Sequence, residues 1–161
     1  MKTDLTRLRG WADAGERLVE AIPGGDWETS TLVHAVALDG TRAAMLLDGP
    51  LNGNCFAGFC EQFLAPTLHP GDLVILDNLS SHKSSSAIAA VERAGAKMIY
   101  LPPYSPDLNP IENVFSKIKQ LIRGLKPRSW QQIIEATKQA LLSLTIDDLY
   151  NAFVHCGYYA T

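Results

Sequence analysis

Hydrophobic and polar positions first alternate along the chain as in strands, and later recur with the spacing of helices. Residues 29–38, rich in Thr, Val and Leu, are typical of a strand, and Asp39-Gly40 joins them to a second strand at residues 41–47. Asn54 is predicted to cap a helix whose apolar positions recur every 3.6 residues, and Pro66 should end or kink it. The first part of the chain therefore predicts a hairpin followed by a helix.

The centre of the chain has a strand–helix–strand pattern. Leu73–Leu76 is short and wholly apolar, as in a central strand that is buried on both faces. Residues 84–86 are serines that can cap a helix through Ala94, and Gly95 stands where helices commonly end. Residues 97–101 form the next predicted strand, so the two strands should be parallel neighbours with a right-handed crossover.

Three helices are predicted beyond a proline-dense loop. Pro110–Leu125 carries its apolar residues on one face and should end at Lys126-Pro127. Residues 129–132 match a capping box for a helix to about Ser143, and residues 145–148 match another. The order of these elements predicts an α/β fold.

Composition narrows the class of protein. A length of 161 residues suits one domain, and 47% hydrophobic with 19% charged residues is typical of a globular protein. The longest apolar runs, residues 43–47 and 87–91, are too short to span a bilayer. Three cysteines without a CxxC motif favour a reducing compartment, and no secretory signal is recognisable, so we expect a cytoplasmic bacterial protein with no membrane partner.

The net charge of −3 is unevenly spread along the chain. No acidic residue occurs from residue 113 to residue 134, whereas five basic residues fall there: Lys117, Lys119, Arg123, Lys126 and Arg128. A local basic face of this kind suits nucleic acid. Charge alone, however, favours an ordinary solvated helix face.

Asp77 and Glu112 are the candidate functional carboxylates. Asp77 follows a strand at the end where α/β sheets bind ligands, although a turn aspartate bonding its own backbone explains it equally well. Glu112 lies in the first turn of the helix, where it also resembles the third residue of a capping box begun by Asn109. His82 is either a metal ligand or a polar residue at a helix entry.

Taken together, the two carboxylates indicate a metal site. Asp77 closes one strand and Glu112 opens the helix after the neighbouring strand, so we expect both to face one crevice. Two close carboxylates require a cation between them, and all-oxygen ligation suits Mg²⁺ or Mn²⁺. Three residues share the helix face of Glu112 further along, namely Ser116, Lys119 and Arg123. A basic stripe beside a metal site suits a phosphodiester substrate.

Two segments of the chain resemble the catalytic core of DDE-type transposases, and most closely the bacterial insertion-sequence group related to mariner elements. They are residues 77–83 (DNLSSHK) and residues 101–113 (LPPYSPDLNPIEN). Thirty-four residues separate Asp77 from Glu112, as in the signature of that group. The resemblance extends from residues 6–10 to residues 155–158.

The resemblance implies a ribonuclease H-like fold, a mixed sheet flanked by helices, in a single catalytic domain over residues 1–161. It implies two divalent ions, Mg²⁺ or Mn²⁺, that clamp a DNA phosphate during strand cleavage and strand transfer. Asp77 would hold or bridge the ions and Glu112 would complete the second site. The implied partners are the DNA of transposon ends and target, bound by Lys117, Lys119 and Arg123, and a second transposase chain in a homodimer.

One departure from the family pattern bears on activity. The family's first catalytic aspartate ends a buried central strand just before the segment that matches residues 2–10, and this strand has no counterpart in the chain. Asp4 and Asp13 do not replace it, because neither follows an apolar run. We therefore expect an N-terminally incomplete domain that is inactive alone. We also expect the hairpin and the Asp77 strand to lie apart, or to close in a register foreign to the family.

The function remains open between two main alternatives. The first is a transposase catalytic domain that works with a partner carrying the N-terminal part. The second is a truncated, inactive transposase fragment that binds DNA or an intact copy. An unrelated Mg²⁺-dependent phosphohydrolase is disfavoured because neither a phosphate-cradling glycine loop nor a nucleophilic aspartate motif is present.

Overall fold

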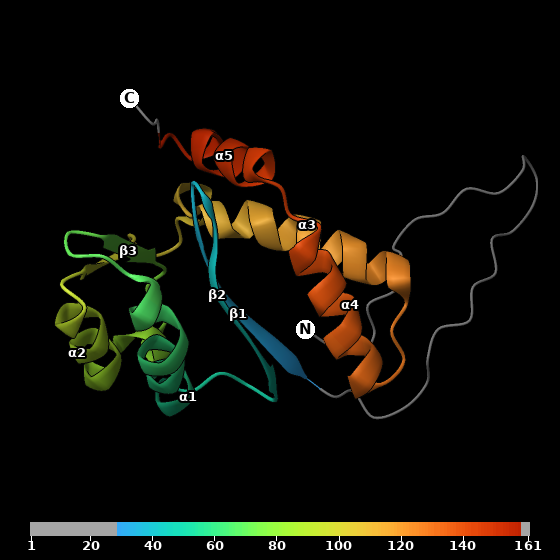
Figure 1. Cartoon of the computed structure of the whole chain (residues 1–161), viewed down its shortest axis with the longest axis horizontal. Coiled ribbons are helices and arrows are strands. Elements are labelled where there is room, and N and C mark those ends of the chain that lie inside the picture. Colours follow the sequence, from blue (N-terminus) through green and yellow to red (C-terminus); the bar gives the residue numbers. More distant parts are fainter. Residues whose placement is uncertain (1–28, 159–161) are drawn as a thin grey trace, which may run out of the picture.

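The computed structural model describes residues 29–158, which form a central hairpin with helices on both sides (Figure 1). The strands are β1 (Ser30–Ala37), β2 (Gly40–Asp48), β3 (Leu73–Leu76) and β4 (Lys97–Tyr100). The helices are α1 (Gly53–Phe59), α2 (Ser85–Arg93), α3 (Pro110–Leu125), α4 (Trp130–Leu142) and α5 (Ile146–His155). Shorter helical turns are η1 (Cys60–Leu64), η2 (Ala65–Thr67), η3 (Ser80–Lys83) and η4 (Pro106–Leu108).

The β1–β2 hairpin lies between two apolar cores because successive strand residues point to opposite faces. Val33 and Ala43 are buried in a core with Phe56 and other residues of α1, α2, β3 and β4. Leu32 and Val36 pack instead against the second core, which α3, α4 and α5 form around Ile118 and other buried side chains. The hairpin thus joins the two groups of helices in one structure.

Two separate two-stranded sheets are present in the described part of the chain. β1 and β2 are antiparallel, whereas β3 and β4 are parallel and pair from Leu73 with Lys97 to Leu76 with Tyr100. The predicted parallel arrangement is confirmed. Among residues 29–158 no ladder joins β1 or β2 to β3, so the hairpin and the Asp77 strand do not pair in a register foreign to the family, although both contribute to one core.

The prediction that β3 is buried on both faces is wrong for residues 29–158. Leu73 is 58% exposed, and Ile99 on β4 is 43% exposed. Val74 and Leu76 point to the other face and contribute to the core under α2. β3 therefore packs through one face and pairs with β4 alone. Leu73 is exposed because no second strand or covering helix of the described residues lies over it.

Two local boundaries differ by one or two residues from the prediction. Ala37 pairs with Gly40, so the hairpin loop is Leu38-Asp39, and Gly40 with φ +150° begins β2 instead of completing the turn. α1 is capped by Asn52, whose side-chain oxygen accepts from the Cys55 N–H at 2.9 Å, and not by Asn54. Asn52 and Asn54 have the same capping chemistry, so residue type does not separate them, whereas the hairpin loop is set by the pairing of Ala37 with Gly40.

The ends of the later helices agree with the sequence. Gly95 follows α2 with φ +79°, and a Cβ there would lie 3.0 Å from the Pro70 Cα, so glycine is required. α3 has the predicted bounds, and Lys126 adopts a left-handed conformation with φ +49° before Pro127. The helix through Pro66 ends as predicted, first through the π-helical turn η1 and then through the 3-10 turn η2.

The capping boxes form to different extents. The Thr145–Asp148 box is complete, with both reciprocal bonds present. Ser129 accepts from the Gln132 N–H at 3.3 Å, but the Gln132 side chain accepts from the Arg128 N–H at 2.6 Å, one residue outside the expected box. Both helices nevertheless begin where the sequence predicts. None of the helices between residues 29 and 158 is long and apolar enough to cross a membrane.

We predict that Ile118→Ala lowers the free energy of unfolding by about 2–5 kcal/mol, because the side chain is fully buried between α3 and its neighbours and the substitution leaves a cavity. Urea denaturation measures the loss. Ile134→Ala is the matched control, since Ile134 is 37% exposed and should lose far less. Equal losses in the two variants would contradict the assignment of Ile118 to the core.

Candidate active site

Asp77 lies directly beyond the carboxyl end of β3, with a side chain that is 40% exposed. Its Oδ1 accepts a hydrogen bond from the Leu79 N–H at 3.2 Å, the self-capping contact of a turn aspartate. The same Oδ1 lies 2.6 Å from Nδ1 of His82. Asp77 therefore has the ordinary turn role together with a second contact, to the His82 side chain five residues further along, that the turn does not require.

His82 is held in place by packing. Its side chain is 15% exposed, and its ring centroid lies 4.5 Å from that of Phe56. The Tyr100 hydroxyl donates to the His82 carbonyl at 3.0 Å. Nδ1 is buried and makes a close contact with Asp77, but it has no aligned hydrogen bond. Neither sequence interpretation of His82 describes this arrangement, in which the ring packs on α1 and its nitrogen faces Asp77.

Glu112 is exposed in the first turn of α3. The capping box that explained it from sequence does not form: Asn109 makes no side-chain capping bond, and the Glu112 N–H donates to the Asn109 carbonyl at 3.1 Å. In the part of the chain that the structure describes, no ion pair or side-chain hydrogen bond involves the Glu112 carboxylate. Helix capping thus does not account for this glutamate.

Asp77 and Glu112 lie on segments that follow the two strands of the small parallel sheet: Asp77 follows β3, and Glu112 lies in α3, the first long helix after β4. β4 pairs with β3, and residues 101–109 lead from β4 into α3, which begins on the side of the molecule where β3 lies and runs away from it (Figure 1). Across residues 29–158 no group of three His, Cys, Asp or Glu side chains forms a metal cluster. Asp77 and Glu112 nevertheless suit Mg²⁺, which typically takes one or two carboxylates and keeps several waters.

The three predicted DNA-binding residues on α3 have different surroundings. Lys117 forms an ion pair with Asp148 of α5 and so ties the two helices together. The Lys119 Nζ lies 5.9 Å from the ring centroid of Phe115, which is a cation–π contact. Arg123 is half-buried and has no charged partner within residues 29–158. Lys119 and Arg123 therefore keep uncompensated charges, whereas the charge of Lys117 is already paired.

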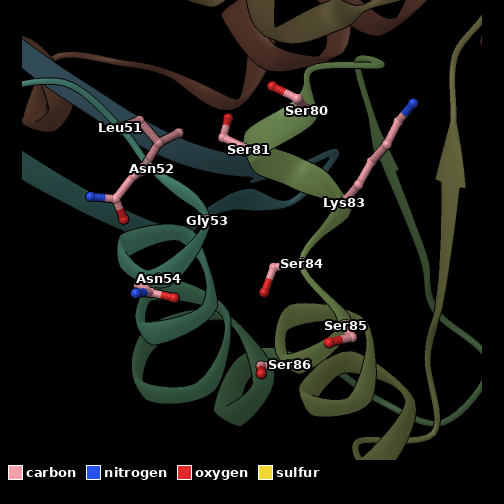
Figure 2. Close-up of a pocket in the computed structure, with 10 residues that line it drawn as sticks. All are labelled: Leu51, Asn52, Gly53, Asn54, Ser80, Ser81, Lys83, Ser84, Ser85 and Ser86. Carbon is pink, nitrogen blue, oxygen red and sulfur yellow. The ribbon is translucent and has the colours of Figure 1, made fainter.

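A polar cavity of about 580 Å³ lies beside η3, between the starts of α1 and α2 (Figure 2). It is lined by Leu51, Asn52, Gly53, Asn54, Ser80, Ser81, Lys83, Ser84, Ser85 and Ser86. The Ser84 hydroxyl points into the space between the two helices, while Lys83 extends away from α1 (Figure 2). No acidic residue lines the cavity, so its chemistry favours an anion or a neutral polar group.

Comparison with known proteins identifies the family. The family model described as DDE superfamily endonuclease matches residues 1–135. The chain belongs to the DDE superfamily of endonucleases. No curated protein matches the chain.

Solved structures of a mariner transposase have the same fold as this DDE domain. The Mos1 transposase paired-end complex with left transposon end matches with a TM-score of 0.75 and 16% identity over 94% of this chain and 47% of that chain. The Mos1 mariner paired-end complex with Mn matches with a TM-score of 0.76 and 15% identity over 94% of this chain and 48% of that chain. The chain thus spans about half the length of these Mos1 chains.

The comparisons confirm the resemblance to DDE transposases and the ribonuclease H-like α/β class. The insertion-sequence origin and the roles of Asp77, Glu112, Lys117, Lys119 and Arg123 stay predictions. Asp4, Asp13 and the segment 6–10 lie outside the described residues. Sequence reasoning missed two features of the site, the packing of His82 on Phe56 and the polar cavity. The five serines at positions 80, 81, 84, 85 and 86 were the available signal for the cavity.

We predict that Lys117→Gln raises the pKa of Asp148. The Lys117 hydrogen bond is the largest cause that holds this pKa at about 2, and the Thr145 bonds add to it. A carboxylate with a lowered folded-state pKa stabilises the fold above its unfolded pKa, and the stabilisation is lost as the pH falls from about 4 to about 2. Carbon NMR titration of Asp148 should show the upward shift.

The stability of the same variant provides a second readout. Lys117→Gln should lose more stability at about pH 7 than at about pH 2, where the carboxylate of the unchanged chain is already being protonated. Lys119→Gln is the control, because Lys119 contacts Phe115 and not Asp148. An Asp148 pKa that is the same in both variants would contradict the role given to Lys117.

Proposed function

We propose that this chain is a transposase catalytic domain that cleaves DNA strands at the ends of an insertion sequence and transfers them, using Mg²⁺ or Mn²⁺. The observation that carries the proposal is that Glu112, in the first turn of α3, has a carboxylate that no capping bond occupies, while Asp77 stands at the end of β3, in a chain of the DDE superfamily. The similar Mos1 structures include a transposon-end complex and a strand-transfer complex, which supports the same function.

Asp77 and Glu112 are the residues that would hold the metal ions. When bound, two such ions activate an attacking oxygen and stabilise the departing one during displacement at a phosphate. The chain itself contributes orientation: β3 and the Leu79 N–H fix Asp77, and α3 presents Glu112 from its first turn. Glu112 is thus positioned by a helix, and Asp77 by the strand end that it follows.

The DNA strand would pass over Lys119 and Arg123, which lie on the same helix as Glu112. Lys119 and Arg123 carry charges that no acidic side chain among residues 29–158 neutralises. The polar cavity beside η3 adds serine hydroxyls close to Asp77 in sequence, and it contains no aromatic ring on which a base would stack. This composition suits the sugar–phosphate backbone, which positions DNA without reading its sequence.

The proposed function also involves a partner chain. The resemblance of residues 77–83 and 101–113 to DDE transposases implies a second transposase chain, and we propose that this chain works in a homodimer or with an intact copy. The similarity to Mos1 paired-end complexes supports this proposal. The second candidate function is an inactive fragment that binds DNA or an intact transposase.

Cleavage of DNA carrying the insertion-sequence ends tests the proposed activity. In the presence of Mn²⁺, Asp77→Asn and Glu112→Gln should each remove nearly all cleavage, because metal ligands act as a unit. Asp107→Asn is the control, since this aspartate is exposed in the loop just before α3. Cleavage that survives either substitution would contradict the assignment, and DNA binding without any cleavage would select the second function.

DNA binding should depend on Lys119 and Arg123. Each phosphate contact contributes about 0.9 to the slope of log K against log salt, so Lys119→Ala with Arg123→Ala should lower the slope by about 2. Fluorescence anisotropy with a labelled duplex over a salt series measures it. Lys138→Ala, an exposed lysine on α4, is the control. An unchanged slope in the double variant would show that Lys119 and Arg123 form a solvated helix face and do not contact DNA phosphates.

A further inference from the structure

We propose that His82 is the positioning residue of Asp77, which holds one carboxylate oxygen so that the other is presented to the metal ions. This inference rests on the proposed function, because it assumes that Asp77 is a metal ligand. It adds a residue and a structural cause to the site: the ring of Phe56, far away in sequence, determines where the imidazole lies.

Both contacts of the Asp77 carboxylate go to the same oxygen. Oδ1 lies 2.6 Å from Nδ1 of His82 and accepts from the Leu79 N–H at 3.2 Å. Among residues 29–158, Oδ2 has no such contact. A carboxylate with one oxygen held on two sides is restrained in rotation, and the other oxygen is left as the ligand. The side chain as a whole is 40% exposed, so the carboxylate is not enclosed by the protein.

His82 is anchored independently of Asp77. Its ring packs at 4.5 Å on Phe56, which is only 5% exposed in the core around α1. Its carbonyl accepts from Tyr100 at the end of β4, and its N–H donates to the Leu79 carbonyl at 3.0 Å. The imidazole therefore packs on α1, and the backbone of His82 is fixed by Tyr100 of β4. Asp77 and His82 are five residues apart in the chain, but Phe56 and Tyr100 from other elements fix where His82 lies.

A second His–Asp pair of the chain shows the contrast. His69 and Asp72 lie three residues apart in an exposed turn, with Nδ1 and Oδ2 3.7 Å apart and side chains that are 74% and 41% exposed. No aromatic ring of the described residues packs on His69. Such a pair contributes little, because both groups remain solvated. It supplies a control of the same residue types within the same protein.

The contact geometry distinguishes a positioning role from direct ligation. Two atoms that bind one Mg²⁺ at right angles lie about 3 Å apart, so a separation of 2.6 Å between Nδ1 and Oδ1 is a direct contact between the side chains. Nδ1 is buried without an aligned hydrogen bond. Hydrogen bonds at catalytic sites are often poorly aligned without the ligand and tighten when it binds. A small rotation of the carboxylate toward a cation would bring Oδ1 onto the Nδ1–H.

Binding of Mn²⁺ to the full chain tests this inference without reference to cleavage. Electron paramagnetic resonance of free Mn²⁺ at constant pH gives the affinity, and thermal unfolding separately reports folding. Loss of a residue that orients a metal ligand typically weakens metal binding by about 10- to 100-fold, and this is the effect expected for His82→Leu. His82→Asn retains an N–H donor near the position of Nδ1 and should restore most of the affinity. His69→Leu should leave it unchanged.

The outcomes separate the inference from the proposed function. If Asp77→Asn abolishes Mn²⁺ binding but His82→Leu does not weaken it, the positioning role is overturned and the metal site stands. If Asp77→Asn leaves Mn²⁺ binding unchanged, the proposed metal site fails and the inference fails with it. If His82→Leu does not fold, His82→Asn decides: a folded Asn variant with retained affinity supports the donor role, and one that binds as weakly as Asp77→Asn overturns it.

Discussion

The alternation of side chains along β1 is the constraint on which the rest of the structure depends. Val33 faces the core that contains α1 and α2, and Leu32 faces the core of α3, α4 and α5. A shift of one residue in the hairpin register would exchange these two sets and leave both cores incomplete. The bulge between Ala35 and Val36 lies within this strand and is compatible with burial on both faces. The helix that presents Glu112 is thus placed, through the hairpin, relative to the helices that surround His82.

The same constraint gives His34 its unusual environment. It lies on the face of β1 toward α3, 8% exposed, with its ring 6.4 Å from that of Phe115. Desolvation lowers the pKa of this histidine to about 4, so the ring is neutral near neutral pH. Its Nε2 lies 3.1 Å from the Thr41 hydroxyl across the hairpin. A polar side chain therefore occupies the contact between the hairpin and the helix that carries Glu112.

The parts of the fold that sequence predicts well are those fixed by local chemistry. α3 begins at Pro110 and ends before Pro127 because proline restricts both positions, and the Thr145 box forms because its two partners are three residues apart. Features that depend on contacts between distant parts of the chain could not be predicted from local sequence. The exposure of Leu73 depends on which strands pair with β3, and the orientation of His82 depends on Phe56. For Glu112 the sequence left capping and function open, and only the backbone geometry at Asn109 shows that no capping box forms.

The separation of the two small sheets has a mechanical consequence. Each sheet is internally connected by backbone hydrogen bonds, but among the described residues only side-chain packing joins the hairpin to β3 and β4. Individual dispersion contacts are weak and can be exchanged one at a time, whereas a displaced ladder loses its hydrogen bonds together. Sliding of packed elements along this boundary would therefore break no ladder. Asp77 follows β3, whereas Glu112 belongs to α3, which packs on the hairpin, so such sliding would change the distance between the two carboxylates.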